Sequence, residues 1–263
     1  MQIPVKKWYD AIYQRRSRRQ FNGRELSTDI TSHLEEFSKE INEYITGVKA
    51  VLVNENPNQV FKGAIGSYGS IKGAPAYVAF VGNMEDANVQ EKVGYIGEGF
   101  ILEATSIGLA TCWVGGFFRK EVAQKQVQIN PNEQILAVSP VGYVDDKYSL
   151  EEKIMSKFAK SHNRKSLDEL CVTEEKNWPS WVQLALDAAR LAPSAINRQP
   201  WRFSVEDNNI KVSADSLKDS YHISKRLDCG IAMIHIEVGA NHGGVKGRWS
   251  YLEKPDVALF EVI

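Results

Sequence analysis

Two segments decide the fold expected for this chain: Arg15-Arg16-Ser17-Arg18-Arg19-Gln20-Phe21 and Ala192-Pro193-Ser194-Ala195-Ile196-Asn197-Arg198-Gln199-Pro200-Trp201. The first places four arginines and a serine where a helix expected from Pro4 should end. Guanidinium groups bind phosphate through charge-assisted, often bidentate hydrogen bonds. The first segment therefore indicates a compact anion site, with a solvated basic face or a nucleic-acid patch as the alternatives.

The second segment has the composition of a turn that could face a flat ligand. Pro193 ends a helix, Ser194 and Asn197 offer small polar groups, and Gln199-Pro200-Trp201 begins the next strand. Such a turn can present polar atoms to a heteroaromatic edge while a proline lies against the ring face. A simple helix stop is the alternative, because Pro, Ser and Asn all favour turns.

Both segments resemble boxes of the FMN-dependent nitroreductase family. The first resembles its Arg-Arg-Ser-x-Arg box, and the second its Pro-Ser-Ser-x-Asn-x-Gln-Pro-Trp box, with Ala195 in place of the second serine. In a typical member both boxes lie near the start of the chain, and a dimer brings one box from each subunit onto one flavin. Here the boxes lie far apart in one chain, so the resemblance implies a monomer that imitates the dimer.

Three further stretches resemble the same family. Residues 108–116 resemble its Gly-Leu-Gly-Thr-x-Trp-x-Gly-Gly segment, where glycines let the backbone approach the flavin ring. Pro140-Val141-Gly142-Tyr143 resembles a strand that ends in Gly-Tyr. Residues 164–170 resemble the tail whose basic residues complete the phosphate pocket, although His162 replaces a lysine often found there.

The resemblance implies an FMN site drawn from both boxes, the glycine-tryptophan segment and the tail. Arg18 falls on the variable position of the first box. The partner site that a two-fold arrangement would create lacks both boxes, so we expect one FMN per chain. The implied cofactor-binding residues are Arg15, Arg16, Ser17, Arg19, Trp113, Val114, Gly115, Gly116, Arg164, Lys165, Pro193, Ser194, Ala195, Asn197 and Gln199.

The implied activity is that of an FMN-dependent NAD(P)H oxidoreductase. A nicotinamide donor would pass hydride to the flavin, and a nitroaromatic or quinone would then be reduced. Because the cofactor carries the chemistry, no side chain need act as a catalytic acid or nucleophile. A flavin-binding protein without turnover, or another flavin reaction such as dehalogenation or flavin fragmentation, are the alternatives.

Composition limits the other classes of function. The 263 residues carry 32 Lys and Arg against 33 Asp and Glu, which argues against a strongly basic nucleic-acid binder. Apolar runs are strand-sized and the first residues lack signal-peptide features, so we expect a cytoplasmic protein without membrane spans. Three cysteines without a Cys-x-x-Cys motif, and His235 and His242 without zinc-helix spacing, suggest neither disulfides nor a metal site.

We expect an α+β protein with a three-layer α/β/α nitroreductase-like fold. Two unequal halves, residues 1–172 and 173–263, should form an intrachain pseudo-dimer, with residues 161–178 as a polar linker. Pro140 suggests that its strand is bulged or at an edge, and Ser149/Glu152 and Ser180/Gln183 have capping-box spacing. Helices are expected from Pro4, from Ser27 or Thr28, over 94–109, 149–160, 180–191 and 227–241, and strands over 48–53, 76–81, 135–144, 202–205, 210–213 and 257–262.

A faint internal repeat supports the idea of two halves. Shifting the sequence by 136 residues aligns Gly94, Ala104, Gly108 and Trp113 with Gly230, Ala240, Gly244 and Trp249. Both segments are apolar, helix-like and followed by glycine and then tryptophan. Two unrelated core helices are the alternative interpretation.

Overall fold

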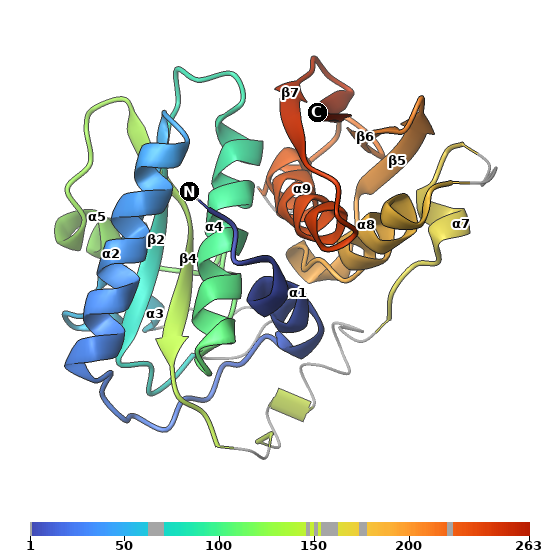
Figure 1. The fold of residues 1–263 in the computed structure, drawn as a ribbon. Coiled ribbons are helices and arrows are strands. Elements are labelled where there is room, and N and C mark those ends of the chain that lie inside the picture. The colour runs from blue at the N-terminus through green and yellow to red at the C-terminus, as the bar shows by residue number, and fades with distance from the viewer. Residues whose placement is uncertain are drawn as a thin grey trace.

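The computed structural model describes residues 2–62, 71–145, 148–149, 152–153, 163–173, 178–219 and 223–263. Its first sheet and associated helices lie on the left of Figure 1, and its second sheet on the right. The elements of the first part are α1 (Val5–Gln14), α2 (Thr28–Tyr44), β1 (Val48–Val53), α3 (Pro57–Phe61), β2 (Ala76–Asn83), α4 (Val89–Ser106), β3 (Ala110–Thr111), α5 (Lys120–Gln126) and β4 (Glu133–Gly142). Those of the second part are α7 (Leu167–Leu170), α8 (Ser180–Arg190), a 3-10 turn (Ala195–Asn197), β5 (Trp201–Glu206), β6 (Asn209–Ala214), α9 (Lys225–His242), β7 (Gly247–Tyr251) and β8 (Asp256–Val262).

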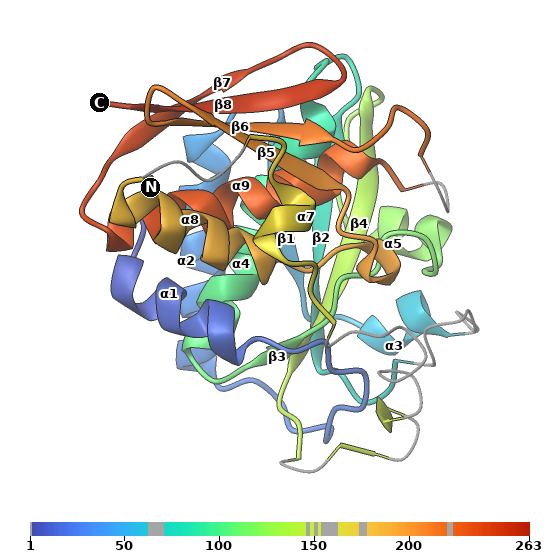
Figure 2. The same cartoon turned by 90° about the vertical axis from the view of Figure 1, so that its right-hand side faces the viewer.

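The two sheets have the same topology. Both are antiparallel, one in the order β1-β2-β4-β3 and the other in the order β5-β6-β8-β7. In each, a long helix, α4 or α9, connects the second strand to the third. Seen from the side, the second sheet and its helices lie in front of the first (Figure 2). The expected fold of two unequal halves is therefore confirmed, while the boundary expected between residues 172 and 173 stays a prediction.

The two long helices cross at a pair of related glycines. A Cβ on Gly94 would lie 2.0 Å from the carbonyl oxygen of Leu227, and a Cβ on Gly230 would lie 2.0 Å from that of Glu91. The offset of 136 residues that relates Gly94 to Gly230 also relates Glu91 to Leu227. Each helix therefore contacts the other through the same positions, as in a two-fold symmetric interface.

Alternating residues of β2 face two separate parts of the core. Val78 and Phe80 pack toward α4 in a core that continues through α9 into the second sheet. Tyr77 and Ala79 face the opposite way, under α3 and α5. The first sheet is thus covered on both faces, which gives the expected three layers, and the shared core joins the two halves.

Several expected elements are confirmed to within a few residues. Ser27 caps α2 by accepting the N–H of Ile30, and the strand expected over 48–53 matches β1. The Ser149/Glu152 capping box is present, because Glu152 N–H donates to Ser149 Oγ and Ser149 N–H donates to the Glu152 carboxylate. The remainder of that expected helix and His162 lie outside the described residues. The linker expected over 161–178 is wrong in part, because Leu167–Leu170 form α7 and Cys171 pairs with Phe203.

The capping box expected at Ser180 is wrong. Pro179 is the N-cap residue of α8 and Ser180 is its first helical residue, without a side-chain cap. Gln183 instead donates from its side chain to Asp187, one turn further along the helix.

The edge position suggested for the strand with Pro140 is also wrong, because β4 lies between β2 and β3. Pro140 lacks an N–H, and it is accommodated where the ladder beside β4 is interrupted. Val138 pairs with Val114, Gly142 pairs with Ala110, and between these pairs Cys112 N–H donates to Ser139 Oγ. The pairing of β2 and β4 is bulged, but between Phe80 and Val81, opposite Leu136, and not at Pro140.

Candidate functional site

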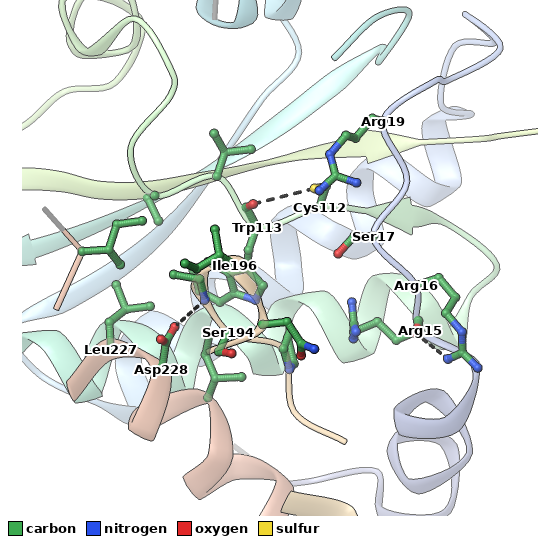
Figure 3. Close-up of a pocket in the computed structure, with 18 of the residues that line it drawn as sticks. Arg15, Arg16, Ser17, Arg19, Cys112, Trp113, Ser194, Ile196, Leu227 and Asp228 are labelled. Carbon is green, nitrogen blue, oxygen red and sulfur yellow. Dashed lines mark hydrogen bonds between the residues drawn. The ribbon is translucent and has the colours of Figure 1, made fainter. Parts of the chain in front are cut away.

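A cavity of about 270 Å³ lies where the two halves meet. Its walls come from the end of α1 and the arginine segment after it, from the segment that follows β3, from the turn after α8 and from the first turns of α9. Figure 3 shows Arg15, Arg16, Ser17 and Arg19 on one side of the cavity and Leu227 and Asp228 on the other, with Trp113, Ser194 and Ile196 between them.

The fold brings together most of the residues expected to bind a cofactor. Thirteen of those fifteen residues line this cavity. Lys165 and Gln199 do not line it and instead support residues that do. The backbone N–H of Lys165 donates to Gln199 Oε1, and the Lys165 ammonium donates to the carbonyl oxygens of Arg198 and Gln199. Whether the lining residues hold a cofactor stays a prediction.

The arginine segment is held in an extended conformation along β3. Ser17 bridges to Thr111, and Arg18 N–H donates to the Thr111 carbonyl oxygen. Successive side chains of extended backbone point in opposite directions, so Arg18 points away from the cavity that Ser17 and Arg19 line. This explains why the variable position of the box can be an arginine without adding to the site.

Glu152 fastens the arginine segment from the side opposite the cavity. Its carboxylate accepts the backbone N–H groups of Arg19 and Gln20 and the Nε–H of Arg18, whose guanidinium lies 4.3 Å from the Tyr148 ring centre. Burial of the carboxyl opposes ionisation, but these hydrogen bonds outweigh it and lower the pKa of Glu152. The charge of Arg18 is thereby compensated within the protein.

Arg15 is a buried cation in the cavity wall. Its burial lowers the pKa of the guanidinium, although nearby Glu98 opposes this. The Arg15 Nε atom lies 3.7 Å from Glu98 Oε1 and makes no hydrogen bond to any described residue. A buried donor of this kind favours an anionic ligand that could accept from the guanidinium.

Arg164 adds a further cation from a distant part of the chain. Burial, followed by repulsion from Arg15 and Arg16, lowers the pKa of Arg164 to about 10. Its guanidinium donates to Asn197 Oδ1 at 2.7 Å, which joins the tail segment to the second box. Cations that repel one another at one cavity wall create the positive potential that an anion would relieve.

The fully buried carboxylate of Glu98 connects the two halves beneath the cavity. It accepts the indole N–H of Trp113 at 2.6 Å and lies 3.1 Å from Nε2 of His235, which belongs to the other central helix. The Trp113 ring also packs closely against α4 because Gly97 has no side chain there, and a Cβ at Gly97 would be 2.4 Å from the indole. Trp113 is therefore fixed by both polar and packing contacts.

The sequence predicted that Gly115 allows a flavin to approach the backbone. In the structure described, the group close to Gly115 is the side chain of Ile223. A Cβ on Gly115 would lie 2.9 Å from Cδ1 of Ile223, so the two halves touch across the cavity at this point. Val114 beside it pairs with Val138 and extends the first sheet to the cavity. A larger residue at position 115 would therefore require the Ile223 side chain to shift.

Sequence patterns missed a second group of lining residues. The signal that could have indicated Asp228 is its isolation as an acid within the apolar start of an expected helix. The apolar residues carried no distinguishing pattern. The missed residues are Ile12, Tyr13, Ile71, Cys112, Phe117, Ala137, Tyr148, Leu191, Ile196, Ile223, Leu227, Asp228 and Ile231.

The family of this chain follows from comparison with known proteins. A family model described as "Putative TM nitroreductase" matches residues 7–240. The chain belongs to this nitroreductase family. The family match extends from α1 through nearly all of α9, so it includes both boxes and both central helices.

The fold is shared by a solved structure of a putative nitroreductase. A putative nitroreductase of Thermotoga maritima superposes with a TM-score of 0.65 at 16% identity, over 97% of this chain and 93% of that one. A nitroreductase with bound FMN from Bacteroides fragilis matches with a TM-score of 0.44 at 17% identity, over 54% of this chain and 91% of that one. An FMN-dependent nitroreductase from Clostridium difficile gives a TM-score of 0.44 at 14% identity, over 53% and 88% of the two chains. The search of curated proteins gives no match.

Membrane-spanning helices and clusters of metal ligands are absent from the described part of the chain. None of its helices combines the length and apolar character needed to cross a bilayer. No group of three or more His, Cys, Asp or Glu side chains there could hold a metal ion. Cys112 and Cys229 are free thiols.

Proposed function

We propose that this nitroreductase-family protein binds one FMN in the cavity between its halves and uses it as an NAD(P)H-dependent oxidoreductase. The observation that carries the proposal is the convergence of Arg15, Arg16, Arg19 and Arg164 on the cavity that the Pro193–Asn197 box also lines. The buried Nε–H of Arg15, without a hydrogen-bond partner among the described residues, fits an anionic ligand. A phosphate about 4 Å from one such guanidinium would gain roughly 4 kcal/mol at an effective dielectric near 20, before desolvation.

Within this proposal the residues of the chain bind and orient the cofactor. The arginines and Ser17 would hold the phosphate and ribityl chain, while the box and the segment 113–116 would lie against the ring system. Bound FMN would supply the hydride chemistry, accepting from NADH or NADPH and reducing a nitroaromatic or quinone. The positive charges of Arg15 and Arg16 would favour the reduced, anionic cofactor.

One cofactor per chain is proposed because, among the described residues, one half of the repeat carries the charged site. Trp249, the counterpart of Trp113, donates its indole N–H to Glu237, and Glu237 also accepts the hydroxyl of Tyr95. Trp249 and Tyr95 are neutral partners of Glu237, whereas Glu98 lies beside the cation Arg15. The chain would then act as a monomer whose halves replace the subunits of a dimer, and its free thiols suit the reducing cytoplasm.

The decisive test is the flavin content of purified protein, followed by turnover. We expect yellow protein that releases close to one FMN per chain on denaturation, and that oxidises NADH or NADPH when menadione or a nitrofuran is added. Arg16→Ala should weaken FMN binding, while Arg24→Ala, whose guanidinium stacks on Tyr143 away from the cavity, should not.

Each alternative gives a different result in this experiment. Protein that stays colourless after soaking with FMN, with no quenching of tryptophan emission, would overturn the proposal. A ratio near two FMN per chain would contradict the single site. Bound FMN without NAD(P)H oxidation would indicate a flavin-binding protein without turnover, and products other than a reduced acceptor would indicate another flavin reaction.

A further inference from the structure

The second box has a backbone conformation that its residues do not normally adopt. Ile196, Asn197 and Gln199 have φ values of 48°, 58° and 48°, all in the left-handed region. Asparagine tolerates this region, but a β-branched residue such as isoleucine rarely occupies it. Residues in such conformations persist only where their surroundings fix them, and they are concentrated at functional sites.

Asp228 of α9 is in a position to fix this backbone. One carboxylate oxygen accepts the N–H of Ala195 at 3.1 Å and the other accepts Nε–H of Arg198 at 2.7 Å. These two hydrogen bonds fix the chain on either side of Ile196 and Asn197. Asp228 is almost completely buried and lines the cavity (Figure 3), so its hydrogen bonds to the box lie at the site itself.

The tail segment fixes the box from the other side. Arg164 donates to Asn197 Oδ1, the Lys165 backbone donates to Gln199 Oε1, and Ser194 Oγ accepts the N–H of Gln199. These contacts use positions that the family resemblance already assigns to the site. Arg198 occupies a variable position of the box and Asp228 lies outside it, so neither is assigned a role by the motif.

We propose that Asp228 and Arg198 are positioning residues that hold the box, and with it Ile196 and Asn197, in the conformation needed to bind FMN. This rests on the proposed function. The pair acts through the backbone. Without the hydrogen bonds of Asp228 to Ala195 and Arg198, Ile196 relaxes out of the left-handed region and the cavity wall between Ser194 and Asn197 changes shape. The residues that contact the ligand then have to be reordered whenever it binds, which weakens binding.

Asp228→Asn is the direct test, with Asp256→Asn as its matched control. Asparagine keeps the size of the side chain but has one acceptor where the carboxylate has two, so Ala195 N–H or Arg198 Nε–H loses its partner. Asp256 belongs to the same half and pairs with Lys211 and Ser213, away from the cavity. We expect the FMN dissociation constant to rise at least tenfold in Asp228→Asn and less than threefold in Asp256→Asn.

A coupled variant separates positioning from a general loss of stability. Glycine adopts a positive φ at little cost, so in an Ile196→Gly background the conformation of the box depends less on the hydrogen bonds to Asp228. We expect Asp228→Asn to raise the dissociation constant less than threefold in that background. An equal effect of Asp228→Asn with isoleucine and with glycine at this position would overturn the proposal, as would an effect no larger than that of the control. Where Asp228→Asn does not fold, Arg198→Gln tests the same pair in the same way.

Hydrogen exchange distinguishes failure of this inference from failure of the proposed function. Backbone amides of residues 195–199 should exchange faster in Asp228→Asn than in wild type, with or without FMN. Wild-type protein that binds no FMN refutes the proposed function, and the positioning role with it, whatever the exchange shows. Wild-type protein that binds FMN, combined with unchanged exchange and affinity in Asp228→Asn, refutes the positioning role alone.

Discussion

Gly94→Ala should destabilise the protein strongly, because it inserts a methyl group where the two central helices touch. The new Cβ would lie 2.0 Å from the Leu227 carbonyl oxygen and 3.0 Å from the Ile231 backbone nitrogen. Backbone atoms of a helix cannot rotate away, so α4 and α9 must separate. Overpacking of this kind costs about 1–3 kcal/mol or more, and we expect the upper part of that range. Replacing Gly by Ala within a helix returns roughly 1 kcal/mol.

The net expectation is a loss of about 2 kcal/mol in the free energy of unfolding. For a chain of this size that corresponds to a fall in melting temperature of roughly 4–8 °C. Urea unfolding followed by tryptophan emission and by circular dichroism measures the free energy, and an unchanged m-value confirms that the folded state stays compact.

Gly99→Ala is the matched control on the same helix. There the new Cβ would lie 3.1 Å from Ile41 Cδ1 and 3.3 Å from the ring of Trp8, which are side-chain atoms that can shift. Helix propensity and mild crowding nearly cancel, so we expect a change within about 1 kcal/mol of zero. A loss in Gly94→Ala no larger than that in Gly99→Ala would refute the close helix crossing.

The reciprocal geometry makes a second demand on the same experiment. Gly230→Ala should cost nearly as much as Gly94→Ala, because its Cβ would meet the Glu91 carbonyl oxygen at the same 2.0 Å. The double variant should cost less than the sum of the two, since helices already forced apart accommodate the second methyl group more easily. Additive losses would mean that the two glycines are independent sites.

Two further predictions concern the residues that shape the site. Glu152→Gln should cost about 1–3 kcal/mol at pH 7, since hydrogen bonds to the carboxylate are weakened. The stabilisation from Glu152 is complete above the ordinary carboxyl pKa of about 4.3, and it disappears as pH falls through the lowered pKa of the folded state. Urea titrations should therefore show wild type and variant converging toward pH 3, and a constant gap would contradict this. Gly97→Ala should tilt Trp113, whose indole a Cβ would meet at 2.4 Å, and a shifted Trp113 indole N–H signal in NMR spectra would show it.

The sequence predicted the long elements well because their burial follows a regular period. Leu34, Phe37 and Ile41 recur at helical spacing and are buried in α2. The short elements were not predicted. Pro57 begins α3, a helix of five residues, and no residue of β7 is fully buried. Their positions are fixed by tertiary packing rather than by local pattern.

The candidate site was predictable where side-chain chemistry is local and not where it depends on contacts across the fold. Arg15 and Arg16 were found because consecutive arginines are conspicuous in any sequence. The compensation of Arg18 by Glu152 depends on residues more than a hundred positions apart, and no periodicity indicates it. Asp228 was missed for the same reason, since only the folded backbone brings it to Ala195 and Arg198.

The central helices show how a duplicated fold can have unequal halves. Each helix buries a carboxylate that accepts an indole N–H, Glu98 from Trp113 and Glu237 from Trp249. Burial raises the pKa of Glu237, and its other partner, Tyr95, is itself buried, which raises the pKa of the Tyr95 hydroxyl and keeps it neutral.

Glu98 differs because it lies beside Arg15 at the cavity wall. A buried carboxylate next to a cation stabilises that cation in a place where water cannot. A carboxylate–indole contact therefore occurs in both halves, although the offset of 136 residues places Ile234, not Glu237, at the position of Glu98. Of the two carboxylates, Glu98 is the one beside Arg15, whose charge contributes to the positive cavity wall.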